Sequence, residues 1–442
     1  MIEVFAIGGY SEIGRNMSAL RTRGGTVILD AGLWLEKVIE YENGNISELS
    51  TEKLWEMEAI PDDREFFKKY GNEVKALICT HAHLDHCGAI PMIAPKYNVP
   101  VIATPFTIEV IKKLFEDRGS GYDKLIRLNP GSSYDLGDGI KVHFIYATHS
   151  TPQTVIVCIE TKDGRVIYAN DFKFDEYPAL GKRTDYEKLK KFGKEGVKLL
   201  ISDSTRIDRE SRTHSESLVR EMLKDILFWV ESKGNLIILT TFSSHIARIK
   251  TMIELVRRIG REPILAGRSL ANYVECAERV RLVNFSKENK VVGYRNEVNK
   301  VLKKINKDRG KYALICTGNQ GEPNSVLVRI ASDETPLKLR ENDIVVFCSE
   351  VIPSPINQAN RSELERRLRN KKVRIFKDVH VSGHAYKEDH RALLQMLRPQ
   401  HYLPTHGTLQ KIAKAVELAN ELDYELGKSA HILQNSQKLV IK

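Results

Sequence analysis

The chain has 442 residues, of which 42% are hydrophobic and 29% are charged, and its 68 lysines and arginines exceed its 58 aspartates and glutamates to give a net charge of +10. This composition is typical of a folded chain of two or three domains and excludes a disordered or fibrous protein. The sequence shows neither ~18 uninterrupted apolar residues nor a secretory signal, so we expect a cytoplasmic protein that does not enter a membrane.

The N-terminal part of the chain is rich in short apolar runs of the kind that form strands. The predicted strands cover residues 2–7, 17–20, 26–30, 74–80, 99–103 and 142–147. Asp163 and Gly164 separate two further apolar runs, residues 155–160 and 165–169, which predicts a β-hairpin.

The pattern changes at about residue 205 to alternating helices and strands. Thr213 to Glu216 resembles a capping box that begins a helix reaching about residue 232, and a second, amphipathic helix is predicted over residues 246–259. Short apolar strands are predicted at residues 235–241, 263–266, 312–317 and 344–348. This alternation predicts a parallel α/β layer.

Strand-like segments and loops rich in histidine return after about residue 375. We therefore predict a first domain that is split into residues 1–205 and 376–442. Residues 206–375 form the domain inserted into it. This organisation requires the two ends of the chain to meet in space.

The strongest chemical signal is the sequence His81-Ala82-His83-Leu84-Asp85-His86, which directly follows a predicted buried strand. Metals such as zinc prefer imidazole nitrogen and carboxylate oxygen as ligands. A tight loop can direct His81 and His83 at one ion, and Asp85 and His86 at a neighbouring ion. The six cysteines include no Cys-x-x-Cys pair, which disfavours a zinc site built on thiolates.

Further metal ligands are expected at the ends of other predicted strands. His149 and Asp171 each follow an apolar run, and His406 follows Tyr402-Leu403-Pro404-Thr405. Sites are commonly built from loops that a rigid scaffold positions. A carboxylate such as that of Asp171 is able to bridge two ions lying ~3.5–4 Å apart.

These motifs resemble those of a known superfamily in type and order. Asp30, the histidine-rich hexad, His149, Asp171 and His406 resemble the motifs of the metallo-β-lactamase superfamily, and Asp203, His384 and His406 resemble the three motifs of its β-CASP group, which acts on nucleic acids. Within that group, residues 8–17, 170–175, 317–323 and 380–384 look like the ribonuclease J family. The chain ends earlier than bacterial members and resembles the shorter archaeal form, which lacks the bacterial C-terminal domain.

The resemblance implies an α/β fold: a metallo-β-lactamase αββα sandwich with an inserted parallel α/β β-CASP domain. It implies two zinc ions, for which manganese could substitute. His81, His83 and His149 would hold one ion, Asp85, His86 and His406 would hold the other, and Asp171 would bridge them.

The resemblance also implies roles for residues around the metals. Asp30 would orient a metal ligand, and Asp203 would orient His384 or a metal-binding histidine. His384 would stabilise charge on the phosphate or protonate the leaving oxygen, so that Asp85, Asp203 and His384 form the catalytic set. Substrate contacts are implied for the stretch His380, Val381, Ser382, Gly383 and His384.

The activity that follows from the resemblance is a zinc-dependent ribonuclease acting on single-stranded RNA. Processive 5′-to-3′ exonuclease activity with a preference for 5′-monophosphate ends is expected, and endonuclease activity is left open. The alternatives are a small-molecule metallo-hydrolase of the same superfamily, a DNA nuclease of the same group, and a nucleic-acid-binding protein without catalysis. A homodimer and protein partners in RNA decay are left open.

Overall fold

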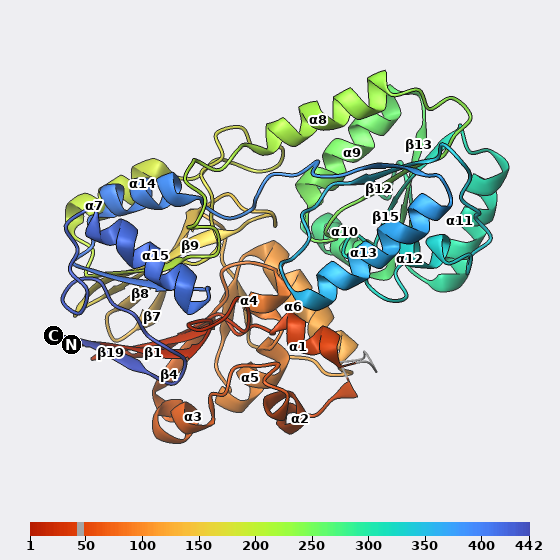
Figure 1. Ribbon diagram of the computed structural model, residues 1–442. Coiled ribbons are helices and arrows are strands. Elements are labelled where there is room, and N and C mark those ends of the chain that lie inside the picture. Colours follow the sequence, from red (N-terminus) through yellow and green to blue (C-terminus); the bar gives the residue numbers. More distant parts are fainter. Residues whose placement is uncertain (42–47) are drawn as a thin grey trace. The chain divides into compact units, whose positions relative to one another are not determined.

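The computed structural model describes residues 1–41 and 48–442, and its contacts divide the chain into two units. The first unit comprises Met1–Glu176, Gly181–Thr213 and Ser382–Lys442, and the second comprises Tyr177–Leu180 and His214–Val381. The first unit contains two β-sheets and the second contains one (Figure 1). The domain boundaries expected at 205/206 and 375/376 remain a prediction.

The first sheet of the first unit is mixed and holds both ends of the chain. Its strands, in spatial order, are β19 (Lys438–Ile441), β1 (Ile2–Gly8), β2 (Met17–Thr22), β3 (Gly25–Leu29), β4 (Val74–Ile78), β5 (Val101–Ala103) and β6 (Leu125–Arg127). The last strand pairs with the first in antiparallel register, Ile2 opposite Ile441, and Figure 1 shows the blue β19 beside the red β1. The predicted meeting of the two ends is therefore confirmed.

The second sheet of the first unit changes from antiparallel to parallel along its width. Its order is β18 (His401–Thr405), β11 (Leu199–Asp203), β10 (Gly164–Ala169), β9 (Val155–Thr161), β8 (Ile140–Tyr146) and β7 (Ser133–Gly137). The predicted hairpin is formed by β9 and β10, whereas β10, β11 and β18 run parallel. The carboxyl ends of these three strands therefore lie at the same edge.

Helices cover the outer faces of the two sheets, and apolar side chains fill the space between them. The inner core joins Val4 and Leu29 of the first sheet to Phe144 and Val157 of the second. Outside the second sheet, a separate core forms against α7 (Tyr186–Glu195), α14 (Lys387–Leu397) and α15 (Leu409–Asn420). Outside the first sheet, α6 (Pro105–Asp117) packs on β5, β6 and α5 (Ile90–Tyr97). The predicted αββα sandwich is confirmed.

The remaining helices of the first unit are short and lie before β7. They are α1 (Leu35–Glu40), α2 (Thr51–Glu56), α3 (Arg64–Tyr70), η2 (Gly71–Glu73), α4 (Leu84–Cys87), α5 (Ile90–Tyr97) and α6 (Pro105–Asp117). No helix in the described parts of the chain has the length and apolarity needed to span a bilayer.

The second unit is a parallel sheet with helices between its strands, as the alternating pattern predicts. Its order is β14 (Lys290–Val292), β13 (Glu262–Ala266), β15 (Tyr312–Cys316), β12 (Ile237–Thr240), β16 (Ile344–Phe347) and β17 (Arg374–Phe376). The helices are α8 (Glu216–Trp229), α9 (Ile246–Arg258), α10 (Arg268–Arg279), α11 (Arg295–Lys307), α12 (Val326–Ala331) and α13 (Pro355–Asn370). All of the strand pairs run in the same direction.

The predicted capping box at Thr213 is wrong. Helix α8 begins at Glu216, and Ser215 is its N-cap, accepting a hydrogen bond from the amide of Ser217. Thr213 instead donates its hydroxyl to the carbonyl of His384. Glu216 is the first residue of the helix, and its side chain forms an ion pair with Arg248.

Candidate metal centre

The histidine-rich hexad lies at the carboxyl end of β4 and turns directly into the short helix α4. His81 and His86 are fully buried, and His83 occupies the N-cap position of α4. The loop after β3 crosses this turn closely, since a Cβ on Gly32 would lie 1.6 Å from the carbonyl oxygen of Asp85. Only glycine permits this approach of two backbones.

Three further segments bring their side chains to the same place from the second sheet. His149 follows β8, Asp171 follows β10 and His406 follows β18. Because β10 and β18 both run parallel to β11, their carboxyl ends deliver Asp171 and His406 at the same edge. The amide of His406, whose φ is +55°, donates to the carbonyl of Gly9.

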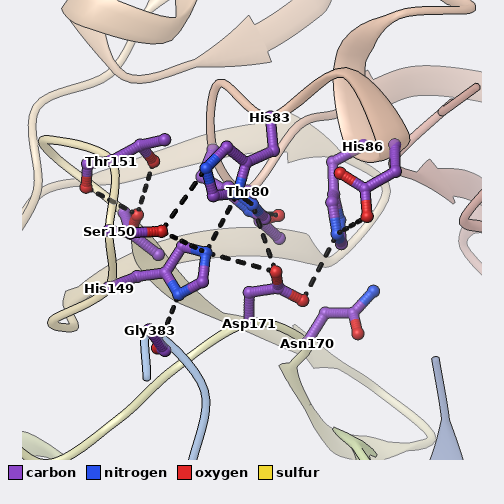
Figure 2. A network of polar contacts seen from close by, with 12 residues as sticks. Thr80, His83, His86, His149, Ser150, Thr151, Asn170, Asp171 and Gly383 are labelled. Atoms are coloured by element: carbon purple, nitrogen blue, oxygen red, sulfur yellow. Dashed lines mark hydrogen bonds and ion pairs between the residues drawn. The ribbon is translucent and has the colours of Figure 1, made fainter. Parts of the chain in front are cut away.

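The first candidate ligand set comprises His81, His83, His149 and one oxygen of Asp171. The Nδ1 atom of His83 lies 3.1 Å from His81 Nε2 and 3.0 Å from His149 Nε2. The Oδ2 atom of Asp171 lies 3.4 Å from His81 Nε2 and 3.3 Å from His149 Nε2. Figure 2 shows His83, His149 and Asp171 pointing toward one another.

The second ligand set uses the other oxygen of the same carboxylate. Asp171 Oδ1 lies 3.3 Å from His86 Nε2 and 3.4 Å from His406 Nε2. Asp85 Oδ2 lies 3.7 Å from His86 Nε2 and 3.6 Å from His406 Nε2. The two oxygens of Asp171 thus face different sets, and its place between His149 and His86 is visible in Figure 2.

The distances within the two sets fit bound metal. Tetrahedral coordination at roughly 2.0–2.1 Å separates neighbouring ligand nitrogens by about 3.4 Å, close to the spacing in both sets. Asp171 Oδ1 is buried with no hydrogen-bond partner among the described residues, as expected of an oxygen that faces a cation.

The ionisation states of His81, His83 and Asp171 also suit a metal. Burial, with His86 nearby, lowers the pKa of His81 to about 3, and burial with His149 keeps the pKa of His83 well below its ordinary value. Burial opposes ionisation of Asp171, yet the imidazoles around it, His86 first, hold its pKa well below its usual range. Neutral imidazoles and an ionised carboxylate are the forms that bind metal.

Asp30 contacts the ring nitrogen of His86 that does not face Asp171. Its Oδ2 atom accepts a hydrogen bond from His86 Nδ1 at 2.9 Å, which leaves Nε2 to face Asp171. Asp30 is itself fixed by the amide of Thr80 at 2.8 Å and the hydroxyl of Tyr168 at 3.0 Å. This is the arrangement that orients a metal-binding histidine.

Sequence reasoning did not single out several of these supporting groups. Thr80 also contacts His81 Nδ1 through its hydroxyl at 3.0 Å, and Asn16 Nδ2 lies 3.2 Å from His86 Nε2. Thr80 directly precedes the hexad, and Asn16 belongs to the glycine-rich motif of residues 8–17, so their positions were the available signals. Tyr168 gave no signal of its role in the sequence, because tyrosine is common in strands.

His384 lies beside the metal ligands together with Asp203. Its Nδ1 atom is 2.9 Å from Asp203 Oδ2 and 3.8 Å from Asp171 Oδ2. Although burial opposes it, these two carboxylates raise the pKa of His384 above its ordinary value. Asp203 accepts from Nδ1, which fixes the orientation of the ring.

The predicted substrate stretch, residues 380–384, is divided between the two units. Ser382, Gly383 and His384 belong to the first unit, whereas His380 and Val381 belong to the second. The carbonyl of Gly383 accepts from His149 Nδ1 at 2.7 Å, and a Cβ on Gly383 would lie 2.9 Å from the hydroxyl of Ser150. The hydroxyl of Ser382 accepts from the amide of His384.

Comparison with known protein families shows that these segments fall within matched domains. Residues 11–225 match the metallo-beta-lactamase superfamily, residues 234–363 match the beta-CASP domain of ribonuclease J, and residues 370–433 match the Zn-dependent metallo-hydrolase RNA specificity domain. The third match was not foreseen from the sequence, which predicted only the completion of the first domain there.

Relatives of known name match over the whole chain. The ribonuclease J of Methanocaldococcus jannaschii is 44% identical over 99% of this chain and 98% of its own length, and that of Pyrococcus abyssi is 41% identical over 100% and 97%. A ribonuclease J of Helicobacter pylori is 29% identical over 95% of this chain and 57% of its own length.

A solved structure shares the fold. It is the crystal structure of a protein of unknown function from Enterococcus faecalis, with a TM-score of 0.65 and 18% identity over the full length of both chains. The archaeal relatives and the three domain matches show that the chain belongs to the ribonuclease J family of metal-dependent nucleases.

Proposed function

We propose that this metal-dependent ribonuclease degrades single-stranded RNA processively from its 5′ end, with a preference for 5′-monophosphate ends. The observation that carries the proposal is the carboxylate of Asp171, whose two oxygens face two separate ligand sets. The 5′-to-3′ direction rests on the family resemblance. Endonuclease activity at the same site is the other outcome that the experiment below distinguishes.

Two zinc ions, or manganese in their place, would be held at this site. His81, His83 and His149 would bind one ion, Asp85, His86 and His406 the other, and Asp171 both. Such a pair of ions supplies a hydroxide nucleophile near neutral pH and offsets the negative charge that builds up on the phosphate.

The chain's own residues position the substrate and move a proton. The hydrogen bond from His384 Nδ1 to Asp203 fixes the ring, and the opposite nitrogen, Nε2, carries the proton that the leaving oxygen receives when the phosphorus–oxygen bond breaks. Burial of Asp203 strengthens this orientation, because its charge is poorly screened there.

Residues 382–384 are the proposed phosphate contact of the first unit. Glycine at position 383 allows an anion to approach the backbone amides, and Gly383 is held in place through His149. The net charge of +10 favours a polyanionic substrate over a small ester. We propose that this substrate is cytoplasmic RNA, and a homodimer or RNA-decay partners remain predictions.

The test uses one RNA of mixed sequence, labelled separately at its two ends and carrying either a 5′-monophosphate or a 5′-triphosphate. Wild-type protein and His83→Ala are incubated with zinc or manganese, and the products are sized over time. We expect immediate release of a labelled mononucleotide from the 5′ end, faster for the monophosphate and lost in His83→Ala.

Other outcomes have definite meanings. Internal fragments from both labels would identify an endonuclease using the same site. Intact RNA alongside cleaved single-stranded DNA would identify a DNA nuclease, and turnover of small esters alone would identify a small-molecule hydrolase. Intact RNA with either metal would contradict the proposal.

A further inference from the structure

Arg248 is a fully buried arginine in the second unit, and the metal centre does not account for it. It lies in the first turn of α9, is 0% exposed, and is the largest fully buried side chain among the described residues. A cation at the N-terminal end of a helix meets the positive end of the helix dipole. Burial of its charge requires strong compensation.

The compensation is complete, because each of the five N–H donors of the guanidinium has a partner. Nε donates to Glu216 Oε1 and Nη2 to Glu216 Oε2, both at 2.7 Å. Nη2 also donates to the carbonyl of Val381 at 3.3 Å. Nη1 donates to the carbonyl of Cys348 at 2.8 Å and to His380 Nδ1 at 2.9 Å. One side chain thus joins α8, the end of β16 and residues 380–381.

The contact with His380 determines where that ring carries its proton. Arginine has no acceptor, so His380 Nδ1 must accept the hydrogen bond and cannot hold a hydrogen. The neutral ring therefore has its hydrogen on Nε2. The Nε2 atom lies 3.9 Å from Glu350 Oε2, so the hydrogen-bearing side of the ring faces this carboxylate.

Glu216 keeps the guanidinium in this orientation. The pair is bidentate, which fixes direction as well as distance. Burial alone would keep Glu216 protonated, but Arg248 and then His245 hold its pKa well below the usual range. His245 Nδ1 also accepts from the amide of Arg248 at 3.3 Å, which fixes the backbone at the start of α9.

We propose that Arg248, oriented by Glu216, is a positioning residue for RNA binding: it fixes His380 as the Nε2–H tautomer and anchors the carbonyl of Val381. The inference rests on the proposed function, since residues 380–384 are the proposed substrate stretch. Both ends of that stretch then have fixed partners. Arg248 contacts His380 and Val381, His149 contacts Gly383, and Asp203 contacts His384.

The test compares Arg248→Lys with Arg261→Lys. Lysine keeps the charge but cannot supply the forked donors that reach His380 and Cys348 together. Arg261 is a matched control, because it is 7% exposed in the same unit and donates to the carbonyls of Ser232 and Asn235. Metal content and melting temperature are measured for both variants.

Two readouts separate positioning from general damage. The ring ¹⁵N shifts of His380, assigned by their loss in His380→Gln, report its tautomer, and kcat and KM are measured on 5′-monophosphate RNA. We expect a single Nε2–H tautomer in the wild type and in Arg261→Lys. In Arg248→Lys we expect mixed tautomers and a kcat/KM lower by about tenfold to a hundredfold, at unchanged metal content.

Glu216→Gln is the second variant, for the case in which Arg248→Lys does not fold. It keeps the shape of the pair and removes its charge, and we expect the same two changes in smaller degree. A retained single tautomer, or a kcat/KM within about twofold of wild type in a folded variant of either position, would overturn the inference. If Arg248→Lys loses the single tautomer but the wild-type protein leaves RNA intact, the result refutes the proposed function instead.

Discussion

At the scale of single residues, the candidate metal centre depends on Asp171, whose carboxylate is shared between two sets of side chains. Asp171 is 2% exposed, and each of its oxygens lies 3.3–3.4 Å from two imidazole nitrogens. An ionised carboxylate that is buried in this way needs positive charge nearby. Hydrogen bonds to the carboxylate of Asp30, the hydroxyl of Thr80 and the carbonyl of Gly383 orient the rings of His86, His81 and His149.

Asp30→Asn should weaken metal binding without removing a ligand. The amide oxygen still accepts from His86 Nδ1, but the negative charge that raises the basicity of His86 is lost. We expect the metal affinity, measured by competition with a chelator, to fall about 10- to 100-fold.

Asp63→Asn is the control for this prediction. Asp63 is also 0% exposed in the first unit, where it accepts from Lys96 and Tyr97. This variant should lose stability and keep its metal affinity. Equal metal affinities in both variants and the wild type would show that Asp30 does not support the centre.

A second carboxylate links stability to pH. Although burial opposes it, the N-terminal ammonium of Met1 and the amide and guanidinium of Arg23 lower the pKa of Asp163 from 3.8 to about 2. A group whose pKa is lower in the folded state stabilises the protein above its unfolded pKa, and this stabilisation disappears as the pH falls toward the folded pKa. Asp163→Asn should therefore lower the free energy of unfolding at pH 6, with the difference shrinking between about pH 4 and pH 2. Urea unfolding at several pH values measures this, and a difference independent of pH would refute it.

At the scale of elements, the centre is built where strands end. The segments that follow β4, β8, β10 and β18 supply the candidate ligands, and the loop after β3 supplies Asp30. Such positions are predictable, because an apolar run followed by His or Asp is visible in the sequence. The short helix α4 within the hexad was not predicted, since four residues carry too little periodicity.

Gly32→Ala tests how closely these loops must approach. The added Cβ would lie 1.6 Å from the carbonyl oxygen of Asp85, so the ligand turn must move. We expect a loss of roughly 1–3 kcal/mol in the free energy of unfolding and a fall in metal content. Gly121→Ala, where the Cβ would meet nothing within 4 Å, should change neither. Full metal content in Gly32→Ala would contradict this account of the turn.

At the scale of the whole molecule, the sequence predicted the sandwich, the inserted parallel layer and the family. It succeeded because apolar periodicity and strand-end ligands are local signals. It missed the role of Arg248, whose partners lie 32 to 133 residues away along the chain, and it took Glu216 for a capping residue. Long-range pairing of this kind depends on tertiary packing that no local pattern records.

The most direct test of the shared centre is anomalous X-ray scattering at the zinc edge from crystals grown with zinc. The account predicts two peaks per chain, one on each side of Asp171, with His81, His83 and His149 around the first and Asp85, His86 and His406 around the second. A single peak, or two peaks that do not contact the carboxylate of Asp171, would contradict it.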